Sequence, residues 1–249
     1  QLPIKVLGVG SNTLIRDGGY NGVIIKLGKN FSHLSKLNEN TIIAGASVLD
    51  KNLSRFALDN SVAGLEFLSC IPGSVGGAIR MNSGCYGYDI SQIIASIQAV
   101  DFDGTIKSIQ SENVKFFYRN SDLPKNLIFL SATFKGENKD RDKIKQKIEK
   151  LSKDKKNTQP SKIKTCGSTF KNPTEQTKKK AWEIIKEAKC DGIKIGDAKI
   201  SDKHCNFFVN SGSATSSDME NLINLVKKRV FEVTGVNLEL ELQIIGEKK

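Results

Sequence analysis

The sequence predicts an α+β protein, because patterns typical of strands and patterns typical of helices are interspersed along the chain. Short apolar or alternating stretches bounded by turn residues indicate strands at residues 4–9, 22–27, 41–45, 93–101, 127–134, 206–210 and 236–245. Apolar residues recur at helical spacing at residues 48–60, within 139–164, and at 178–188 and 215–231. No internal repeat is visible.

The predicted elements of the first half are short and are separated by polar turns. Residues 4–9 form an apolar run that leads directly into glycines. In the predicted helix at residues 48–60, Leu49, Leu53 and Phe56 share one face, which indicates packing against a core. The pair Asp103-Gly104 is a hairpin signal, so we expect the strand at residues 93–101 to fold back there.

A lysine-rich region at residues 139–164 contains Ile144, Ile148 and Leu151 at helical spacing. Two interpretations are open, an amphipathic helix with a solvated lysine face or a surface that binds an anionic ligand, and the periodicity favours the first. The sequence Gln159-Pro160 then predicts a break and a domain boundary.

The strongest helix signal lies at residues 215–231. Ser217 and Glu220 have the spacing of a capping box, and Gly235 is a stop signal. The following strand at residues 236–245 alternates leucines with Glu239, Glu241 and Gln243, which predicts one buried and one exposed face.

The amino-acid composition limits the classes of protein to which this chain can belong. Charged residues make up 26% of the 249 residues and hydrophobic ones 38%, which favours neither disorder nor a membrane protein. No apolar run approaches the roughly 20 residues of a spanning helix, and no signal-peptide pattern is seen, so a soluble, cytoplasmic protein is expected. The five cysteines form no CxxC pair and are expected as reduced thiols. With only two histidines, no multi-histidine metal site is expected.

A glycine-rich stretch at residues 64–87 contains six glycines and one proline among apolar residues. Exposed N–H groups in such turns attract phosphate and other anions, and the net charge of +11 agrees with an anionic partner. Taken alone, such a stretch is more often a set of tight turns in an all-β layer than a binding loop. A second short motif, Gly-Val-Gly-Ser-Asn at residues 8–12, follows the first predicted strand and is a weak phosphate-binding signal.

Six sequence blocks occur in an order that resembles one enzyme family. They are Gly-Val-Gly-Ser-Asn (8–12) with Arg16-Asp17, Gly-Leu-Glu-Phe-Leu-Ser (64–69), Ile-Pro-Gly-Ser-Val-Gly-Gly (71–77), Tyr-Arg-Asn-Ser (118–121), Gly-Ser-Thr-Phe-Lys-Asn-Pro (167–173) and Leu-Glu-Leu-Glu (238–241). The ordered set is similar to the short form of the UDP-N-acetylenolpyruvoylglucosamine reductase (MurB) family.

The resemblance implies a vanillyl-alcohol-oxidase type FAD-binding domain plus a smaller α+β substrate-binding domain. The implied division is 1–28 with 238–249 as the first part of the FAD-binding domain, 29–158 as its second subdomain, and 159–237 as the substrate-binding domain. The family also implies a segment before the first glycine motif, so we expect an upstream piece to be missing from this sequence.

The resemblance implies bound FAD, with NADPH as co-substrate. The matched cofactor-binding positions are Gly8, Gly10, Ser11, Asn12, Ile71, Pro72, Gly73, Ser74, Gly76 and Gly77. In the family, hydride passes from the reduced flavin N5 to C3 of a UDP-N-acetylglucosamine enolpyruvate and a proton is added at C2, a step of peptidoglycan synthesis. No metal is implied.

The resemblance also implies roles for residues that would act on the substrate. Arg119 and Glu241 match the pair that stabilises the substrate carboxylate, Ser168 matches the proton donor, and Tyr118 and Asn172 match substrate-binding positions. Each of these residues alone would more often be a turn, a cap or a solvent-facing position. Asp191 stands where many relatives have lysine, which places a diphosphate contact from that turn in doubt.

Two other functions compete with the reductase. The basic charge fits a nucleic-acid-binding module, but aromatic residues are only 7% and are not interleaved with the lysines. The second competing function is that of another flavin oxidoreductase with the same fold. The motifs around Ser168 and Glu241 argue against this function. We expect a monomer with no nucleic-acid or membrane partner.

Overall fold

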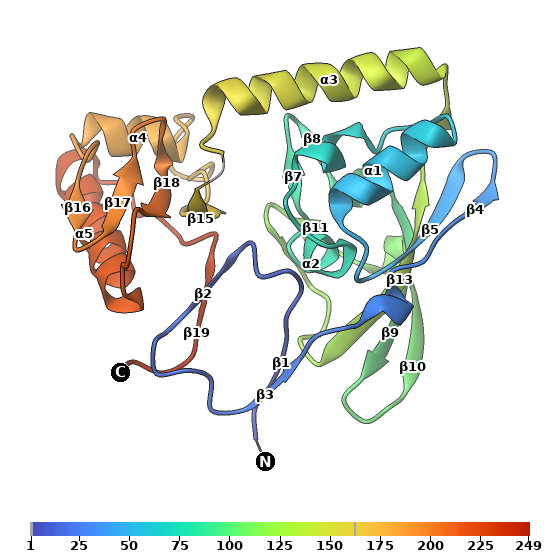
Figure 1. Cartoon of the computed structure of the whole chain (residues 1–249), viewed down its shortest axis with the longest axis horizontal. Helices are drawn as coiled ribbons and strands as arrows, with labels where there is room; N and C mark the ends of the chain where they lie inside the picture. Colours follow the sequence, from blue (N-terminus) through green and yellow to red (C-terminus); the bar gives the residue numbers. More distant parts are fainter. Residues whose placement is uncertain (1, 162) are drawn as a thin grey trace. The chain divides into compact units, whose positions relative to one another are not determined.

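The computed structural model describes residues 2–161 and 163–249, which form two compact units. Unit 1 comprises the first residues of the chain with Gly10–Ile24 and Lys156–Lys249, and unit 2 comprises Val6–Val9 and Ile25–Lys155. Both contain helices and sheets (Figure 1), so the α+β prediction is confirmed. Among the described residues, no helix is both long and apolar enough to cross a membrane.

Unit 2 is built on a five-stranded antiparallel sheet in the order β10-β9-β13-β5-β4. The strands are β4 (Leu34–Asn38), β5 (Thr41–Gly45), β9 (Ile94–Asp101), β10 (Ile106–Gln110) and β13 (Leu127–Lys135). The central strand β13 buries Leu127, Phe129, Ala132 and Phe134, and a register shift between Phe129 and Ser131 interrupts its alternation. These side chains anchor one hydrophobic core.

Two helices and several short elements complete this core. The helices are α1 (Asp50–Asp59), which packs on the 3₁₀ turn η2 (Glu66–Cys70), and α2 (Val75–Arg80), which packs on β13 and β5. The shorter elements are η1 (Lys29–Phe31), β6 (Val62–Ala63), β7 (Gly84–Cys85), β8 (Tyr88–Asp89), η3 (Ile90–Gln92), η4 (Ser111–Asn113), β11 (Phe116–Phe117), β12 (Asn120–Ser121) and β14 (Glu137–Asn138). The glycine-rich stretch therefore lies within the core of unit 2 and is not a surface linker.

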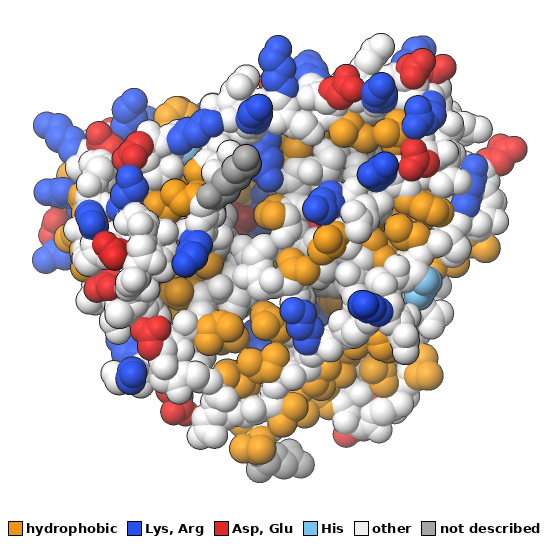
Figure 2. All heavy atoms as spheres, in the orientation of Figure 1, with side chains coloured by type: hydrophobic (Ala, Val, Ile, Leu, Met, Phe, Trp, Pro, Cys, Tyr) orange, Lys and Arg blue, Asp and Glu red, His pale blue; other side chains and the backbone are white. Residues whose placement is uncertain are grey.

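Helix α3 (Arg141–Thr158) is the predicted lysine-rich helix. Ile144 and Leu151 are buried, and in Figure 2 the Lys and Arg side chains over this helix have acidic side chains between them. Two lysines are not simply solvated: Lys147 pairs with the buried Glu66 at 3.2 Å, and Lys155 donates to the Cys70 carbonyl at 2.7 Å. The helix is thus attached to the glycine-rich stretch through its lysines.

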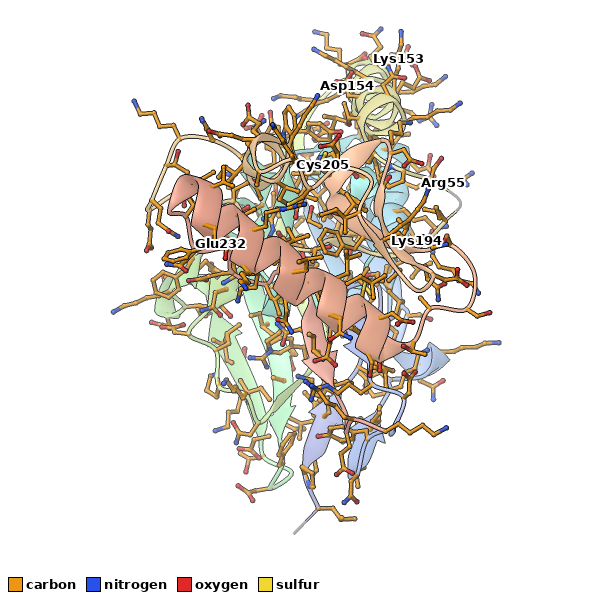
Figure 3. All side chains as sticks on the ribbon, turned by 90° about the vertical axis from the view of Figure 1, so that its left-hand side faces the viewer. Arg55, Lys153, Asp154, Lys194, Cys205 and Glu232 are labelled. Atoms are coloured by element: carbon orange, nitrogen blue, oxygen red, sulfur yellow. The ribbon has the colours of Figure 1, made fainter. Side chains whose placement is uncertain are left out.

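Unit 1 contains a four-stranded sheet in the order β15-β18-β17-β16, with two helices packed on it. The elements are β15 (Lys164–Ser168), α4 (Ala181–Glu187), β16 (Lys194–Ile195), β17 (Ala198–Ser201), β18 (His204–Asn210) and α5 (Ser216–Thr234). In Figure 3, α5 lies in the foreground across this sheet, with Glu232 near its C-terminal end. The buried stripe of α5 is the predicted one: Leu222, Ile223, Val226 and Val230.

The N-terminus of α5 differs from the prediction. The capping box is formed by Thr215 and Asp218, two residues earlier than expected, and not by Ser217 and Glu220. Glu220 instead accepts hydrogen bonds from Nε and Nη2 of the Arg16 guanidinium, each at 2.8 Å. A bidentate ion pair to a distant segment is stronger than a local cap bond, so the spacing alone misassigned this glutamate. Gly235 ends the helix with φ = 71°, as predicted.

In unit 1, a segment from the first part of the chain contacts segments from its last part. Strand β19 (Gln243–Ile245) pairs in parallel with β2 (Thr13–Ile15), and Asp17 accepts the Ser216 N–H and hydroxyl at 2.8 and 2.7 Å. The strand predicted at residues 236–245 is regular only in β19, because before it the chain pairs with residues 169–171 through a single Phe170–Leu240 bridge. Strands β1 (Ile4–Val6) and β3 (Val23–Ile25) form a separate pair.

The predicted three-part domain division stays a prediction. The chain break expected after residue 158 lies near the change from unit 2 to unit 1 at Lys155 and Lys156. Unit 1 also includes Gly10–Ile24 and the C-terminal residues, so residues 238–249 lie in the same unit as the segment predicted to bind substrate.

Candidate functional site

The loop at residues 71–77 is held by backbone pairing with the segment before α1. The N–H groups of Val75 and Gly76 donate to the carbonyls of Val48 and Ala46, each at 2.9 Å. The N–H groups of Gly73, Ser74 and Gly77 have no acceptor within the described residues. These three donors remain available for an anion, as the sequence predicted for this loop.

Glycines in both predicted cofactor motifs lie close to side chains of unit 2. A Cβ on Gly8 would lie 2.7 Å from Ser74 Oγ, and a Cβ on Gly73 would lie 2.4 Å from Asp50 Oδ2. Because real Cβ atoms do not approach other atoms so closely, a side chain at either position would force Ser74 or Asp50 to move. The Gly8 motif and the 71–77 loop therefore meet at Ser74.

The last three residues of the first motif, Gly10, Ser11 and Asn12, belong to unit 1. Gly10 has φ = 79° in a turn closed by the Thr13 N–H on its carbonyl at 3.2 Å. The Asn12 side chain donates to the Glu241 carbonyl at 3.0 Å, and the Asn12 carbonyl accepts the Gln243 N–H at 2.9 Å. Asn12 thus fixes the backbone of the predicted catalytic Glu241, a role not visible in the sequence.

Asp50 lies beneath the loop as a fully buried carboxyl, and neither of its oxygens has a hydrogen-bond partner within the described part of the chain. Burial raises its pKa well above the ordinary value, and no charged neighbour contributes. The N-terminus of α1 favours the ionised form by at most about 2 kcal/mol, whereas full burial can shift a pKa by roughly 3–5 units. Desolvation wins, so Asp50 is neutral at low and moderate pH.

We expect the contribution of Asp50 to the free energy of unfolding to fall as pH rises from about 4 towards its raised pKa, because the unfolded chain releases a proton there that the folded chain keeps. The Asp50→Asn variant should lose that dependence, and each unit by which the pKa is raised corresponds to about 1.4 kcal/mol. Urea titrations between pH 4.5 and 7.5 measure the slope. Asp59→Asn, at the exposed end of the same helix, is the matched control. Parallel pH profiles for Asp50→Asn and the parent chain would contradict a neutral Asp50.

Arg119 lies at the tip of the hairpin formed by β11 and β12, in which Phe117 pairs with Asn120. Its φ of 56° is in the left-handed region, which is strained for a residue with a side chain. The guanidinium donates to the Gly84 carbonyl at 2.6 Å and lies 4.9 Å from the ring centre of Tyr118. One guanidinium edge is thus anchored to the β7 strand, and the neighbouring Tyr118 is exposed.

Two residues that the sequence reasoning missed position this hairpin. The buried Asn82 donates to the Phe117 carbonyl at 3.0 Å and accepts the Ser91 N–H at 3.0 Å. Arg80 donates to the carbonyls of Leu123 and Leu127, and burial lowers its pKa. Both residues lie within a few positions after the 71–77 loop. No pattern in the sequence distinguishes a side chain that donates hydrogen bonds to backbone carbonyls from a side chain that is solvated.

Ser168 and Glu241 come together in unit 1. The Glu241 N–H donates to the carbonyl of Thr169, the residue after Ser168, at 2.9 Å. Gly167 has φ = 81° at a bulge in β15, which interrupts the pairing with β18 immediately before Ser168. Both Ser168 and Glu241 are half-buried. The backbone pairing thus brings the chain segments that contain Ser168 and Glu241 together.

Asn172 has a structural contact that the sequence did not suggest. Its side-chain oxygen accepts the N–H of Ala181, the first residue of α4, at 3.0 Å. It therefore helps to hold the start of this helix, and its predicted contact with substrate stays a prediction.

The chain is similar to known proteins along almost its whole length. Residues 159–245 match the family described as UDP-N-acetylenolpyruvoylglucosamine reductase, C-terminal domain, and residues 1–110 match the family described as FAD binding domain. A UDP-N-acetylenolpyruvoylglucosamine reductase of Pelagibacter ubique is 51% identical over 242 residues, which cover 97% of this chain and 80% of the relative. The corresponding Rickettsia massiliae protein is 45% identical, with 99% of this chain and 82% of the relative covered. The chain belongs to the UDP-N-acetylenolpyruvoylglucosamine reductase family.

A solved structure agrees with this family assignment. The crystal structure of the UDP-N-acetylenolpyruvylglucosamine reductase (MurB) from Thermus caldophilus superposes with a TM-score of 0.84 at 32% identity, covering 99% of this chain and 86% of that one. The predicted combination of an FAD-binding domain with a separate second domain is thereby confirmed for this member of the reductase family.

The residues of this reductase fit FAD. Three free backbone donors in the 71–77 loop suit a diphosphate, the Ser74 hydroxyl faces Gly8, and the glycines leave no side chain between the loop and a ligand. Among the described residues, no cluster of His, Cys, Asp and Glu could hold a metal ion. The unit 2 half of the predicted cofactor set is therefore sterically and chemically suited to an anionic, extended cofactor.

Proposed function

We propose that this reductase-family member uses NADPH and FAD to reduce UDP-N-acetylglucosamine enolpyruvate to UDP-N-acetylmuramate, a step of peptidoglycan synthesis. Family membership supports the overall reaction. The observation that supports the assignment of residues is the pairing of residues 169–171 with residues 239–241, which joins the chain segments that contain Ser168 and Glu241. We also propose that the protein acts in the cytoplasm as a monomer, with no nucleic-acid or membrane partner.

Bound FAD would supply the hydride transfer to C3 of the enolpyruvyl group. This chain would hold the cofactor through the two glycine motifs, with Gly73, Ser74 and Gly77 donating backbone N–H groups to the diphosphate. Ile71 and Pro72 would contribute the apolar edge of the same loop. The proposed set also includes Gly8, Gly10, Ser11, Asn12 and Gly76.

Arg119 would bind the substrate carboxylate. Reduction at C3 moves negative charge towards that carboxylate, so a fixed cation there stabilises the transition state more than the ground state. The Gly84 carbonyl occupies one edge of the guanidinium and fixes its plane, and Tyr118 lies along it. An arginine oriented in this way can offer parallel N–H bonds to a carboxylate.

Ser168 would deliver the proton to C2. A hydroxyl is a weak acid, but the carbon that it protonates is far more basic than a carboxylate, and the half-buried position limits competition from water. Glu241, whose backbone is held by Asn12 and Thr169, would stabilise the substrate side of this step. A carboxyl group beside a carboxylate substrate holds its proton more tightly, so it can donate a hydrogen bond.

The test separates the two half-reactions on the FAD-loaded protein. NADPH should bleach the flavin absorption band anaerobically, and UDP-N-acetylglucosamine enolpyruvate should then restore it with formation of UDP-N-acetylmuramate. UDP-N-acetylglucosamine, which lacks the enolpyruvyl group, is the control and should leave the band bleached. Restoration by the control compound, or no restoration by the enolpyruvyl compound, would reject the assignment.

A further inference from the structure

One lysine of α3 lies on the buried side of that helix. Lys147 is three residues after Ile144 and four before Leu151, so it lies on the same helix face as these two buried side chains. An apolar residue is the usual choice at such a position, because this face packs against a core. Lys147 is half-buried there, and its Nζ contacts two different elements of unit 2. Both contacts lead to the candidate site.

The first contact is with η2, the 3₁₀ turn that ends directly before the 71–77 loop. Lys147 Nζ lies 3.2 Å from Glu66 Oε2, and the Glu66 side chain is only 3% exposed. The same oxygen accepts the Gly64 N–H at 3.0 Å. A buried carboxylate is costly unless it is paired and hydrogen-bonded, and these two donors meet that requirement. Pairing with Glu66 therefore keeps the Lys147 ammonium group against η2.

The second contact is with β8. Lys147 Nζ lies 4.3 Å from the centre of the Tyr88 ring, which is a cation–π distance. The Tyr88 ring also stacks on the ring of Phe67 in η2, with 6.0 Å between the ring centres and an angle of 16° between the ring planes. The Lys147 ammonium group thus bridges η2 and β8 close to the point where their aromatic rings meet.

Strand β8 leads to Arg119. It pairs with β7, in which Gly84 is the partner of Asp89, the residue after Tyr88. No side chain fits between the two strands at Gly84, because a Cβ there would overlap the Tyr88 carbonyl oxygen. The Gly84 carbonyl in turn accepts a hydrogen bond from Arg119 Nη2 at 2.6 Å. The position of β8 against η2 therefore determines where this carbonyl holds the guanidinium.

We propose that Lys147 is a positioning residue for Arg119. By joining Glu66 to Tyr88, it fixes β8 against η2, and β8 fixes the Gly84 carbonyl that orients the guanidinium. Lys147 acts through these elements and does not touch the substrate. The expected effect on turnover rests on the proposed function of Arg119, whereas the link from Lys147 to β7 does not.

The Lys147→Met variant removes the ammonium group and keeps a long apolar side chain. We expect kcat/KM for the enolpyruvyl compound to fall about 10-fold, because a guanidinium displaced by a fraction of an ångström binds the carboxylate less well. Bleaching of the flavin band by NADPH should stay within about twofold of the parent, since Arg119 acts on the substrate. Lys147→Arg keeps the charge, the pairing with Glu66 and the cation–π contact, so its kcat/KM should lie within about threefold of the parental value.

Two further variants control for the fold. Lys153, which is labelled on α3 in Figure 3, is exposed, so Lys153→Met should behave as the parent does. Lys147→Met leaves Glu66 buried without its cation, which by itself destabilises a protein. The double variant Glu66→Gln/Lys147→Met removes both charges and keeps an acceptor for the Gly64 N–H. It should unfold near the parental temperature and still show kcat/KM lowered about 10-fold, because η2 and β8 are no longer joined by the ammonium group.

Hydrogen–deuterium exchange of the FAD-loaded protein tests the link to β7 without substrate. In Lys147→Met, the amides of residues 84–89 should exchange at least about fivefold faster than in the parent, because the β7–β8 pair opens more often. In Lys153→Met, the exchange of these amides should not change. Parental exchange rates at residues 84–89 in Lys147→Met overturn the proposal, whatever the activity shows.

A double-mutant cycle tests whether Lys147 acts through Arg119. If it does, combining Lys147→Met with Arg119→Lys should lower kcat/KM little further than Arg119→Lys alone, because that variant already lacks the bond to the Gly84 carbonyl. Two effects that multiply would show independent roles and overturn the proposal. A parent protein that does not reduce the enolpyruvyl compound would refute the proposed function instead, and the exchange comparison would still test the link from Lys147 to β7.

Discussion

Replacing Ser168 by alanine should slow the reduction of the enolpyruvyl substrate by roughly 10²- to 10⁴-fold, the usual contribution of a positioned proton donor. Bleaching of the flavin band by NADPH should be unchanged, because Ser168 acts only when C2 of the substrate is protonated. Stopped-flow absorbance measures the two half-reactions separately. The Gly167 bulge that presents the hydroxyl does not depend on the serine side chain, so the fold should be retained.

The control for this variant is Ser213→Ala. Ser213 is an exposed serine of the same unit, and its loss should change neither half-reaction. If Ser168→Ala slowed both half-reactions equally, a disturbed cofactor site would be the explanation and Ser168 would not be the proton donor. A rate within threefold of the parent would exclude the role altogether.

Replacing Arg119 by lysine should lower kcat/KM for the enolpyruvyl substrate by about 10- to 150-fold, which corresponds to one hydrogen bond to a charged group worth roughly 1.5–3 kcal/mol. Lysine keeps the positive charge and the same left-handed backbone strain, so the substitution isolates the planar fork. It removes the bond to the Gly84 carbonyl and the second N–H to the carboxylate. Steady-state kinetics with saturating NADPH measure the change.

Arg141→Lys is the matched control, because Arg141 is an exposed arginine of unit 2 whose pairing with Asp59 at 3.2 Å is at the surface. Such pairs contribute about 0–1 kcal/mol to stability, so activity should be parental. An Arg119→Lys variant with parental kcat/KM would show that charge alone suffices there, and the proposed bidentate contact would be wrong.

The sequence was sufficient where a local signal decided the structure. The apolar run at residues 41–45 is β5, and the stripe of Leu222 and Val226 is buried on α5, because periodicity reports directly which face meets a core. Strand β4 escaped prediction because almost all of its side chains are exposed at the edge of the sheet. An edge strand needs a neighbour more than it needs an apolar pattern.

The motifs of the candidate site could be identified in the sequence. The hydrogen bonds and ion pairs that individual residues of those motifs form could not. Glu66 accepts the Gly64 N–H and pairs with Lys147. Asn12 donates to the Glu241 carbonyl, and Asn172 accepts the N–H of the first residue of α4. These contacts join residues from 2 to 229 positions apart, and only tertiary structure brings most of them together. Resemblance identifies where a motif lies, whereas hydrogen bonding shows which of its members support the others.

The parallel pairing of β2 with β19 has a consequence for how the chain is completed during synthesis. Most of unit 2 has emerged by Lys155, whereas residues 10–24 must wait for β19 and for the Glu220 partner of Arg16. At about 5–20 residues per second, that delay is on the order of 10 to 40 seconds. The segments of Ser168 and Glu241 can therefore pair only after residues 239–241 have emerged, when the flavin loop of unit 2 has long been synthesised.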